Sequence, residues 1–284
     1  MTLSLTFRLP AFATAEAEHI AARRFGKPGA VRRLPSERDQ NFLIRFADGG
    51  RGVLKISHVG EDREVLELQH QALRRLAERA PSVALPRVIP ALDGVEVVEL
   101  PAADGETHYA RLLSWVPGML LAEVRPHGPE LLESLGRVIA QLDAGLEGLD
   151  HPAARRELKW DLVRAGWIRE HLAQVADPAR RALVERVLER FDRDVVPLLG
   201  ELRAGIIYND ANDYNLLVRG DDAWSRRVTG AIDFGDLVHS AQVCDLAIAA
   251  AYASLGKPDP GAAVARVAAG YHAVRALTGL ELEL

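Results

Sequence analysis

Cysteine, lysine and long apolar runs are scarce in this 284-residue chain, and each shortage excludes a class of protein. The single cysteine, Cys244, permits neither an internal disulfide framework nor a cysteine zinc cluster, which fits a reducing compartment and predicts a cytoplasmic protein. The longest nearly apolar stretch, residues 246–255, is about half of the roughly 20 residues that a membrane-spanning helix needs, so we expect no membrane partner. The amino terminus lacks a basic segment followed by an apolar run, so we expect no signal peptide.

An excess of basic charge is missing as well. The formal charge is -5 and the isoelectric point is about 6.0, whereas nucleic-acid-binding proteins usually carry a concentrated basic surface. We therefore expect no nucleic-acid partner. The nine histidines have no metal-ligand spacing such as His-x3-His, which disfavours a metal hydrolase, and we expect His70 and His171 on helix surfaces. Lysine is rare beside arginine, and the lysines are Lys27, Lys55, Lys159 and Lys257.

The first 115 residues have the pattern of a mainly antiparallel sheet that carries one long helix. Apolar residues recur at helical spacing over residues 61–79, and a shorter amphipathic helix is expected over residues 14–25. Asp48-Gly49-Gly50 and Ala103-Asp104-Gly105 are typical of hairpin turns. Short apolar runs predict strands over residues 31–34, 42–46, 53–56, 95–100 and 108–115.

The pattern changes to long helices after Trp115-Val116-Pro117-Gly118, where we expect the boundary between two lobes. The predicted helices cover residues 129–146, 160–172, 178–199, 241–255 and 260–277. Short strands are expected over residues 205–208, 216–218 and 228–232. The fold class predicted is α+β and bilobal, with an antiparallel β-sheet N-lobe over residues 1–115 and a larger, mainly helical C-lobe over residues 116–284.

An aspartate and an asparagine, Asp210 and Asn215, lie five positions apart between two predicted strands. In phosphoryl transfer, such an aspartate accepts the proton of an attacking hydroxyl while the asparagine binds magnesium at the phosphates. The same spacing also occurs in turns, because Asn and Asp side chains hydrogen-bond their own backbone in loops. On spacing alone, both interpretations remain open.

A second pair of carboxylates, Asp233 and Asp236, directly follows the predicted strand at residues 228–232. An aspartate followed by a flexible glycine at the end of a strand can bind a metal ion, although it is also typical of an ordinary turn. The order of the motifs decides between these readings. The base loop comes first, the hairpin strands follow and the metal aspartate comes last, all after a β-rich lobe, which favours a magnesium-dependent kinase.

Lys55 provides an independent indication from the first lobe, because it is the only charged residue in the strand Val53-Leu54-Lys55-Ile56. Strand alternation places it on the face opposite Leu54 and Ile56. Its ammonium suits the α- and β-phosphates of a nucleotide, although a lysine whose stem covers apolar surface is the alternative. Such a lysine needs a carboxylate to orient it, and of Glu64 and Glu67 on the following helix we favour Glu67.

With these residues assembled, the chain resembles the aminoglycoside phosphotransferase superfamily, which is protein-kinase-like, and within it the hydroxylysine kinase branch. The similarity runs from about residue 13 to the end. It includes residues 34–42 (LPSERDQNF), 53–56 (VLKI), 67–69 (ELQ), 111–118 (RLLSWVPG) and 232–236 (IDFGD).

This resemblance implies roles for individual residues. Lys55 would bind the nucleotide phosphates and Glu67 would orient it, while Ser36 and its neighbours would form the loop above the phosphates. The backbone of Ser114, Trp115 and Val116 would meet the purine. Asp210 would be the catalytic base, Asn215 and Asp233 would bind Mg²⁺, and Asp245 would be structural.

The chain departs from the superfamily pattern in front of the base. Tyr208 replaces the usual histidine and Asn209 stands where glycine is common, so the departure concerns the geometry of this loop more than its chemistry. The chain also stops at Leu284, earlier than its relatives do. In some bacterial relatives the kinase is the first domain of a longer chain with a pyridoxal-phosphate, aminotransferase-like class III domain, so the resemblance leaves room for additional C-terminal domains.

The predicted activity is transfer of the terminal phosphoryl group of ATP or GTP to a hydroxyl of a small amine-bearing acceptor, such as hydroxylysine or ethanolamine. Its partners would be the nucleotide and this amino alcohol, whose ammonium Asp213 and Asp236 can receive. Two alternatives remain. One is an antibiotic kinase acting on aminoglycosides or macrolides, and the other is a catalytically weak nucleotide-binding scaffold domain, suggested by Tyr208.

Overall fold

A computed structural model describes residues 10–36, 38–101 and 105–284. The predicted turn residues Ala103 and Asp104, and Glu37 of the first motif, lie outside the described residues. The chain divides into two compact units. One comprises the described residues up to Ala77 together with Leu85–Pro117, and the other comprises Glu78–Ala84 together with Gly118–Leu284. No helix in the described ranges combines the length and the apolar character needed to cross a bilayer.

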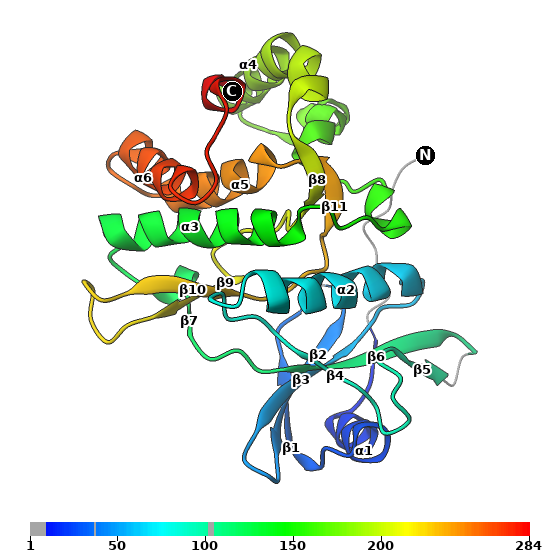
Figure 1. Ribbon diagram of the computed structural model, residues 1–284. Helices are drawn as coiled ribbons and strands as arrows, with labels where there is room; N and C mark the ends of the chain where they lie inside the picture. The colour runs from blue at the N-terminus through cyan, green and yellow to red at the C-terminus, as the bar shows by residue number, and fades with distance from the viewer. Residues whose placement is uncertain (1–9, 37, 102–104) are drawn as a thin grey trace. The chain divides into compact units, whose positions relative to one another are not determined.

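The first unit contains a six-stranded antiparallel sheet, with strands in the order β1-β2-β3-β6-β4 and β5 paired with β6 (Figure 1). The turn predicted at Asp48-Gly49-Gly50 is confirmed: Gly49 has a φ of 89°, and Asp48 Oδ1 accepts a hydrogen bond from Gly50 N at 3.0 Å. The elements are α1 (Thr14–Phe25), β1 (Gly29–Leu34), β2 (Gln40–Phe46), β3 (Arg51–Ile56), α2 (Arg63–Arg79), β4 (Val88–Ile89), β5 (Val98–Pro101) and β6 (Thr107–Ser114).

The core of this unit forms where neighbouring strands turn apolar side chains to the same face of the sheet. Phe42 and Ile44 on β2, Leu54 on β3 and Leu112 on β6 are fully buried. Helix α1 adds Phe25 to the same cluster. Each side chain of this size contributes about 1.5–3 kcal/mol when it is removed from water. The alternation read from the sequence therefore corresponds to a real buried face.

The second unit is mainly helical, and α3, α5 and α6 pack alongside one another (Figure 1). The unit also contains two small antiparallel sheets, with strands in the orders β10-β9-β7 and β11-β8. Its helices are α3 (Pro129–Leu146), α4 (Pro178–Arg190), α5 (Val243–Ser254), α6 (Pro260–His272) and α7 (Gly279–Glu283). Its strands are β7 (Met119–Leu120), β8 (Ala204–Ile207), β9 (Leu216–Arg219), β10 (Arg227–Ala231) and β11 (Val238–Ala241). The short helical turns are η1 (Leu121–Glu123), η2 (Pro152–Arg155), η3 (Leu162–Gln174), η4 (Phe191–Val195) and η5 (Val196–Glu201).

Helices α3 and α6 cross at two glycines. A Cβ atom added to Gly136 on α3 would lie 1.9 Å from the carbonyl oxygen of Val267, and one added to Gly270 on α6 would lie 2.0 Å from that of Glu133. Both distances are far below van der Waals contact. The backbones therefore approach each other more closely than any side chain would permit.

The unit boundary between Pro117 and Gly118 lies within the segment Trp115–Gly118, two residues after the predicted end of the first lobe at residue 115, and residues 78–84 belong to the second unit. The reason is backbone pairing: Ala84 N donates to Thr229 O at 2.8 Å, and Ala84 O accepts from Ala231 N at 3.2 Å. The sequence around Ala84 carries no sign of this distant partner.

The helices predicted over residues 160–172 and 178–199 are not continuous α-helices. Residues 162–174 form the 3₁₀ segment η3, in which no described side chain is fully buried. Helix α4 ends at Arg190 and continues as the π-turn η4 and the 3₁₀ helix η5. Pro197, at the start of η5, has no N–H for an α-helical hydrogen bond.

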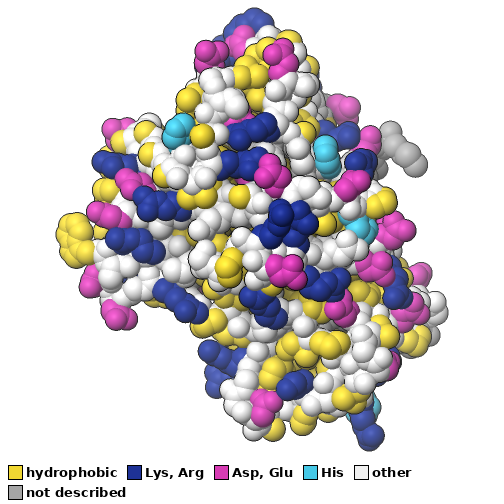
Figure 2. All heavy atoms as spheres, in the orientation of Figure 1, with side chains coloured by type: hydrophobic (Ala, Val, Ile, Leu, Met, Phe, Trp, Pro, Cys, Tyr) yellow, Lys and Arg dark blue, Asp and Glu magenta, His cyan; other side chains and the backbone are white. Residues whose placement is uncertain are grey.

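Two further features of the molecule are its mixed surface charge and the burial of its single thiol. On the face in view, basic and acidic side chains are intermixed (Figure 2), in keeping with 35 basic and 40 acidic residues in the chain. Cys244 on α5 is buried, and burial raises the pKa of its thiol to about 12.

Candidate active site

The loop between β8 and β9 brings the predicted base and metal ligand together. Asn215 Nδ2 donates to Asp210 Oδ2 at 2.6 Å and to the Asp210 backbone carbonyl at 3.2 Å. Asn212 Nδ2 donates to the other carboxylate oxygen, Asp210 Oδ1, at 2.6 Å. Both oxygens of Asp210 are therefore held, which fixes the orientation that a general base needs.

The electrostatic environment of Asp210 suits proton transfer near neutral pH. Burial raises the pKa of Asp210 to about 7, with further contributions from the charges of Asp236 and Asp233, against the lowering effect of the hydrogen bonds from Asn212 and Asn215. A general base works best when its pKa lies near the operating pH. Three carboxylates gathered in this way also favour a cation in the site.

A second loop, which follows β10, is tied to the first. Ile232 N donates to the Asn215 carbonyl at 2.9 Å, and Gly235 N donates to Asp233 Oδ1 at 3.2 Å. Asp233 has a φ of 56°, a left-handed conformation that is uncommon outside glycine and that clusters at functional sites. Asn215 and Asp233 offer an amide oxygen and a carboxylate, the hard oxygen ligands that Mg²⁺ takes. The chemistry of this donor set fits the predicted metal ion.

Tyr208 braces the catalytic loop where the superfamily usually has histidine. Its ring is fully buried and lies 4.9 Å from the Phe234 ring, centre to centre, while its hydroxyl donates to the Ile232 carbonyl. Tyr208 thereby links the base loop to the metal loop. Asn209, where glycine is common, has a φ of 62°, and asparagine tolerates this conformation better than most residues. Both departures are thus accommodated in the fold.

Asp245 on α5 supports the same loop from behind. Its Oδ2 accepts from Tyr208 N at 2.7 Å and its Oδ1 accepts from Asn209 N at 2.5 Å. Two backbone N–H groups just before Asp210 are therefore held by one fully buried carboxyl group. The structural role inferred for Asp245 from the resemblance agrees with these contacts.

Arg156 is a contributor that sequence reasoning missed. Its Nη2 donates to the backbone carbonyls of Gly235 at 2.5 Å and Leu237 at 3.1 Å, on either side of Asp236. These contacts hold the metal loop from outside. The partners are about 80 residues away in the chain, so no local pattern could have indicated them.

The two residues predicted to receive the acceptor's ammonium differ in exposure. Asp213 is half-buried, its backbone carbonyl accepts from Ala122 N at 2.9 Å, and its charge and that of Asp210 contribute to raising the pKa of Tyr252, after the larger effect of burial. Asp236 is buried and acts on Asp210 through its charge. Asp213 is therefore more accessible than Asp236.

In the first unit, Lys55 lies on the buried central strand β3, opposite Asn41 on β2 and Arg111 on β6. Ser36, in the predicted phosphate loop, is exposed, and its Oγ accepts from Asn41 Nδ2 at 3.3 Å. Burial alone would raise the pKa of Asp39, but the hydrogen bond with His58 and the charges of Lys55 and Arg111 lower it to about 2. Two buried cations and one ionised carboxylate thus share this region.

Glu67 has a different partner from the one that we predicted. It is half-exposed and its Oε1 accepts from Arg63 Nε at 2.9 Å, one helical turn earlier. The buried face of α2 presents Gln69 instead, whose Oε1 accepts from Arg111 Nη1 at 2.8 Å. The charge of Lys55 also acts on Asp39, whose pKa it helps to lower. The orientation of Lys55 by Glu67 stays a prediction.

His70, expected on a helix surface, is buried on α2, so that prediction was wrong. Its Nδ1 lies 3.2 Å from Glu96 Oε2, a carboxylate that also binds Arg74. Burial and the charge of Arg111 lower the pKa of His70 to about 4. The histidine therefore packs as a neutral ring.

The residues predicted to meet the purine are held on and just after β6. Ser114 Oγ accepts from Arg87 N at 2.8 Å, and Trp115 N donates to the Arg51 carbonyl at 3.0 Å. The Arg51 guanidinium lies over the Trp115 ring at 5.6 Å, and Val116 is buried. These contacts fix the backbone of this segment, on which the predicted purine contact depends.

Comparison with known proteins identifies similar chains and folds. The model of the Phosphotransferase enzyme family matches residues 30–282. Hydroxylysine kinase from Danio rerio is 30% identical over 283 residues, which cover 96% of this chain and 79% of that protein. The solved structure of the microcompartment-associated aminopropanol kinase has a TM-score of 0.74 at 22% identity, covering 95% of this chain and 83% of the other. An aminoglycoside phosphotransferase from Alicyclobacillus acidocaldarius has a TM-score of 0.65 at 18% identity, covering 96% and 80%.

These matches confirm two predictions. The α+β, protein-kinase-like fold, with an antiparallel sheet and a larger helical part, is the fold of the solved structures. The resemblance to aminoglycoside phosphotransferases and to hydroxylysine kinases is likewise confirmed.

Proposed function

This chain belongs to the Phosphotransferase enzyme family, and from that membership we propose that it transfers the terminal phosphoryl group of ATP or GTP to a hydroxyl group of a small amino alcohol of the hydroxylysine type. The family supplies the reaction class, phosphoryl transfer to an alcohol. The nucleotide, the metal ion and the acceptor are our proposals.

One observation carries the proposal. Asp210, its two amide partners and Asp233 lie on two loops that are hydrogen-bonded to each other, and the pKa of Asp210 is about 7. An ordinary Asx turn requires neither the raised pKa nor the second acidic loop. A hydroxyl group bound at Asp210 meets an oriented acceptor for its proton.

The remaining roles follow from the chemistry of phosphoryl transfer, in which positioning and charge neutralisation do most of the work. Asp210 accepts the hydroxyl proton, and Asn215 and Asp233 would hold Mg²⁺, which would supply positive charge to neutralise the phosphates. Lys55 binds the α- and β-phosphates beneath the loop that contains Ser36. The backbone of residues 114–116 contacts the purine.

The acceptor is proposed to carry an ammonium group. Asp210, Asp213 and Asp236 concentrate negative charge at the catalytic loop, which favours a cationic molecule over a neutral sugar. The similarity to hydroxylysine kinases and to an aminopropanol kinase, by their names, points to the same class. Asp213, the more accessible of the two predicted contacts, is our choice for the ammonium.

A transfer assay tests this proposal. The purified chain with Mg²⁺ and either ATP or GTP is offered hydroxylysine, aminopropanol, ethanolamine, choline, homoserine and kanamycin, and phosphorylated product is measured. We expect the highest kcat/KM with hydroxylysine or aminopropanol. Preference for kanamycin would favour an antibiotic kinase, and no transfer to any acceptor would favour the scaffold reading.

The variant Asp210→Asn links the activity to the site. It keeps the size of the side chain but removes the base, so transfer should fall by at least about 100-fold. Stabilisation of the chain by nucleotide and Mg²⁺, read from the unfolding temperature, should remain. Asp221→Asn, which changes an exposed aspartate in the turn after β9, is the matched control and should behave as wild type.

A further inference from the structure

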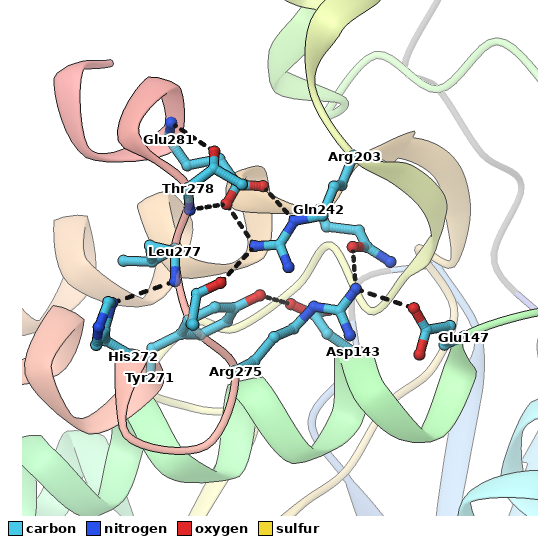
Figure 3. Close-up of polar contacts among 11 residues, drawn as sticks. Asp143, Glu147, Arg203, Gln242, Tyr271, His272, Arg275, Leu277, Thr278 and Glu281 are labelled. Atoms are coloured by element: carbon cyan, nitrogen blue, oxygen red, sulfur yellow. Dashed lines mark hydrogen bonds and ion pairs between the residues drawn. The ribbon is translucent and has the colours of Figure 1, made fainter.

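Behind Asp245 lies a second buried carboxyl group that the proposed mechanism does not use. Asp143 on α3 is 1% exposed and Asp245 is fully buried. The two side chains interact directly, and the Tyr271 hydroxyl on α6 donates to Asp143 Oδ2 at 2.6 Å. Figure 3 shows Tyr271 reaching from its helix to Asp143.

The hydrogen bonds of this pair are unequal. Asp245 accepts a backbone N–H on each of its oxygens, as an ionised carboxylate does. Asp143 accepts one hydroxyl on Oδ2, and within the described part of the chain its buried Oδ1 has no hydrogen-bond donor. An ionised carboxylate would leave that oxygen unsatisfied at a cost of about 1–3 kcal/mol or more, whereas a protonated acid can donate to Asp245.

Electrostatics favour the same arrangement. Two buried carboxyl groups in contact cannot both ionise without a large cost. Burial and the charge of Asp245 raise the pKa of Asp143 well above its usual range, against Tyr271 and Arg275, which lower it. Burial raises the pKa of Asp245 to about 6, against the lowering effect of its hydrogen bonds. One proton is therefore kept in the pair, and Asp143 holds it more tightly.

We propose that Asp143 and Tyr271 are positioning residues for the catalytic loop. Tyr271 donates to Asp143, the protonated Asp143 donates to Asp245, and Asp245 holds the N–H groups of Tyr208 and Asn209 directly before Asp210. The chain of hydrogen bonds thus runs from α6 through α3 and α5 to the base. This assignment rests on the proposed function, because it concerns the positioning of the proposed base.

The far end of this chain is fixed by the packing of the helices. Tyr271 directly follows Gly270, one of the two glycines at the crossing of α3 and α6. Beside it, Arg275 Nη2 donates to Gln242 Oε1 at 2.7 Å and to Glu147 Oε1 at 3.2 Å (Figure 3). The backbone that carries Tyr271 is therefore held in place at the helix crossing.

Three variants test the proposal through kcat and KM, with hydroxylysine and ATP as substrates. Asp143→Ala breaks the chain of hydrogen bonds and should lower kcat by about tenfold or more, because a small displacement of a reacting group slows the reaction strongly. The nucleotide KM should be unchanged. Asp143→Asn keeps a donor toward Asp245 and an acceptor for Tyr271, so it should restore most of the lost kcat. Tyr271→Phe removes one hydroxyl and should lower kcat in the same direction, by less.

The location of the proton is tested by the reciprocal variant. Asp245→Asn turns an amide NH₂ group toward a backbone N–H, so it should lower kcat further than Asp143→Asn does. Wild-type behaviour of Asp245→Asn with a damaged Asp143→Asn would overturn the assignment. The assignment would also be overturned if Asp143→Ala kept the wild-type kcat, or if it changed nothing except to raise the nucleotide KM. Should Asp143→Ala fail to fold, Tyr271→Phe with wild-type kcat would overturn it equally.

Urea unfolding separates failure of this inference from failure of the proposed function. The midpoints should be similar for wild type and Asp143→Asn, and lower for Asp143→Ala and Asp245→Asn, whatever the enzyme phosphorylates. Asp221→Asn again serves as the control. If wild type transfers nothing to any acceptor, the proposed function fails, and this order of midpoints decides whether the hydrogen-bond chain exists. Equal urea midpoints for Asp143→Asn and Asp143→Ala would refute the chain of hydrogen bonds.

Discussion

The crossing of α3 and α6 gives the sharpest prediction about stability, and the perturbation is Gly136→Ala. The new Cβ atom would lie 1.9 Å from the Val267 carbonyl oxygen and 2.6 Å from the Tyr271 backbone nitrogen. Both are backbone atoms, so no side-chain rotation relieves the clash. The helices must separate, and packing contacts along their length are lost.

The magnitude follows from two opposing effects. Overpacking a tight site typically costs about 1–3 kcal/mol, and occasionally more, and a clash with backbone atoms on both sides belongs at the upper end. Alanine in place of glycine within a helix returns up to about 1 kcal/mol. We therefore expect a net loss of about 2 kcal/mol or more, which lowers the melting temperature by at least about 4 °C for a chain of this size.

Chemical and thermal unfolding measure this effect. Gly270→Ala, whose Cβ would lie 2.0 Å from the Glu133 carbonyl oxygen, should lose a similar amount. Gly200→Ala is the control, because an added Cβ there meets no atom within 4 Å. If Gly136→Ala were as stable as Gly200→Ala, the close approach of α3 and α6 would be refuted, and with it the support that this crossing gives to Tyr271.

Three further predictions concern other parts of the molecule. The pKa of His70 is about 4 in the folded protein against a usual 6.5. The stabilisation that this histidine contributes should therefore be fully present above pH 6.5 and should be lost as the pH drops toward 4, which lowers the free energy of unfolding by up to about 3 kcal/mol. His70→Gln should flatten this pH dependence when the free energy of unfolding is measured by urea titration. Arg203→Ala leaves the buried carboxylate of Glu281 without its guanidinium and should cost about 3 kcal/mol in unfolding free energy, whereas a combined Arg203→Met and Glu281→Leu variant should recover most of it. Lys55→Ala should weaken the stabilisation of the fold by ATP and Mg²⁺ while leaving the free protein folded, and an unchanged nucleotide-dependent shift in melting temperature would contradict its proposed phosphate contact.

Local patterns were enough to locate the sheet, the two acidic loops and the long helices other than those expected over residues 160–172 and 178–199. Strand alternation around Lys55 and the spacing from Asp210 to Asn215 are short-range properties, and the fold keeps them. Glu67 shows the limit of such reasoning. Two glutamates on one helix were compared without knowing that Arg63 precedes one of them by a single turn on an exposed face, and that Gln69 faces the buried strands.

Other features that could not be predicted depend on distant partners. Arg156 contacts carbonyls about 80 residues away, and Asp143 meets Tyr271 across 128 positions. Ala84 joins the second unit through hydrogen bonds to Thr229 and Ala231. Such contacts arise only when the chain has folded, and single side chains without a periodic pattern carry no signal of them. Tyr208, where the superfamily usually has histidine, illustrates the same point, because the hydrogen bond from its hydroxyl to the Ile232 carbonyl forms only in the folded structure.

The burial of Cys244 has a practical consequence for studying the enzyme at work. A thiol with a pKa of about 12 and almost no exposed surface is a poor target for maleimide reagents at neutral pH, because the thiolate is the reactive form. The natural sequence is therefore already a clean background for labelling. A cysteine introduced at the exposed Ala47 or at the exposed Trp224 would carry a fluorophore, without first removing any native thiol. The dye would then report changes in its own surroundings during turnover.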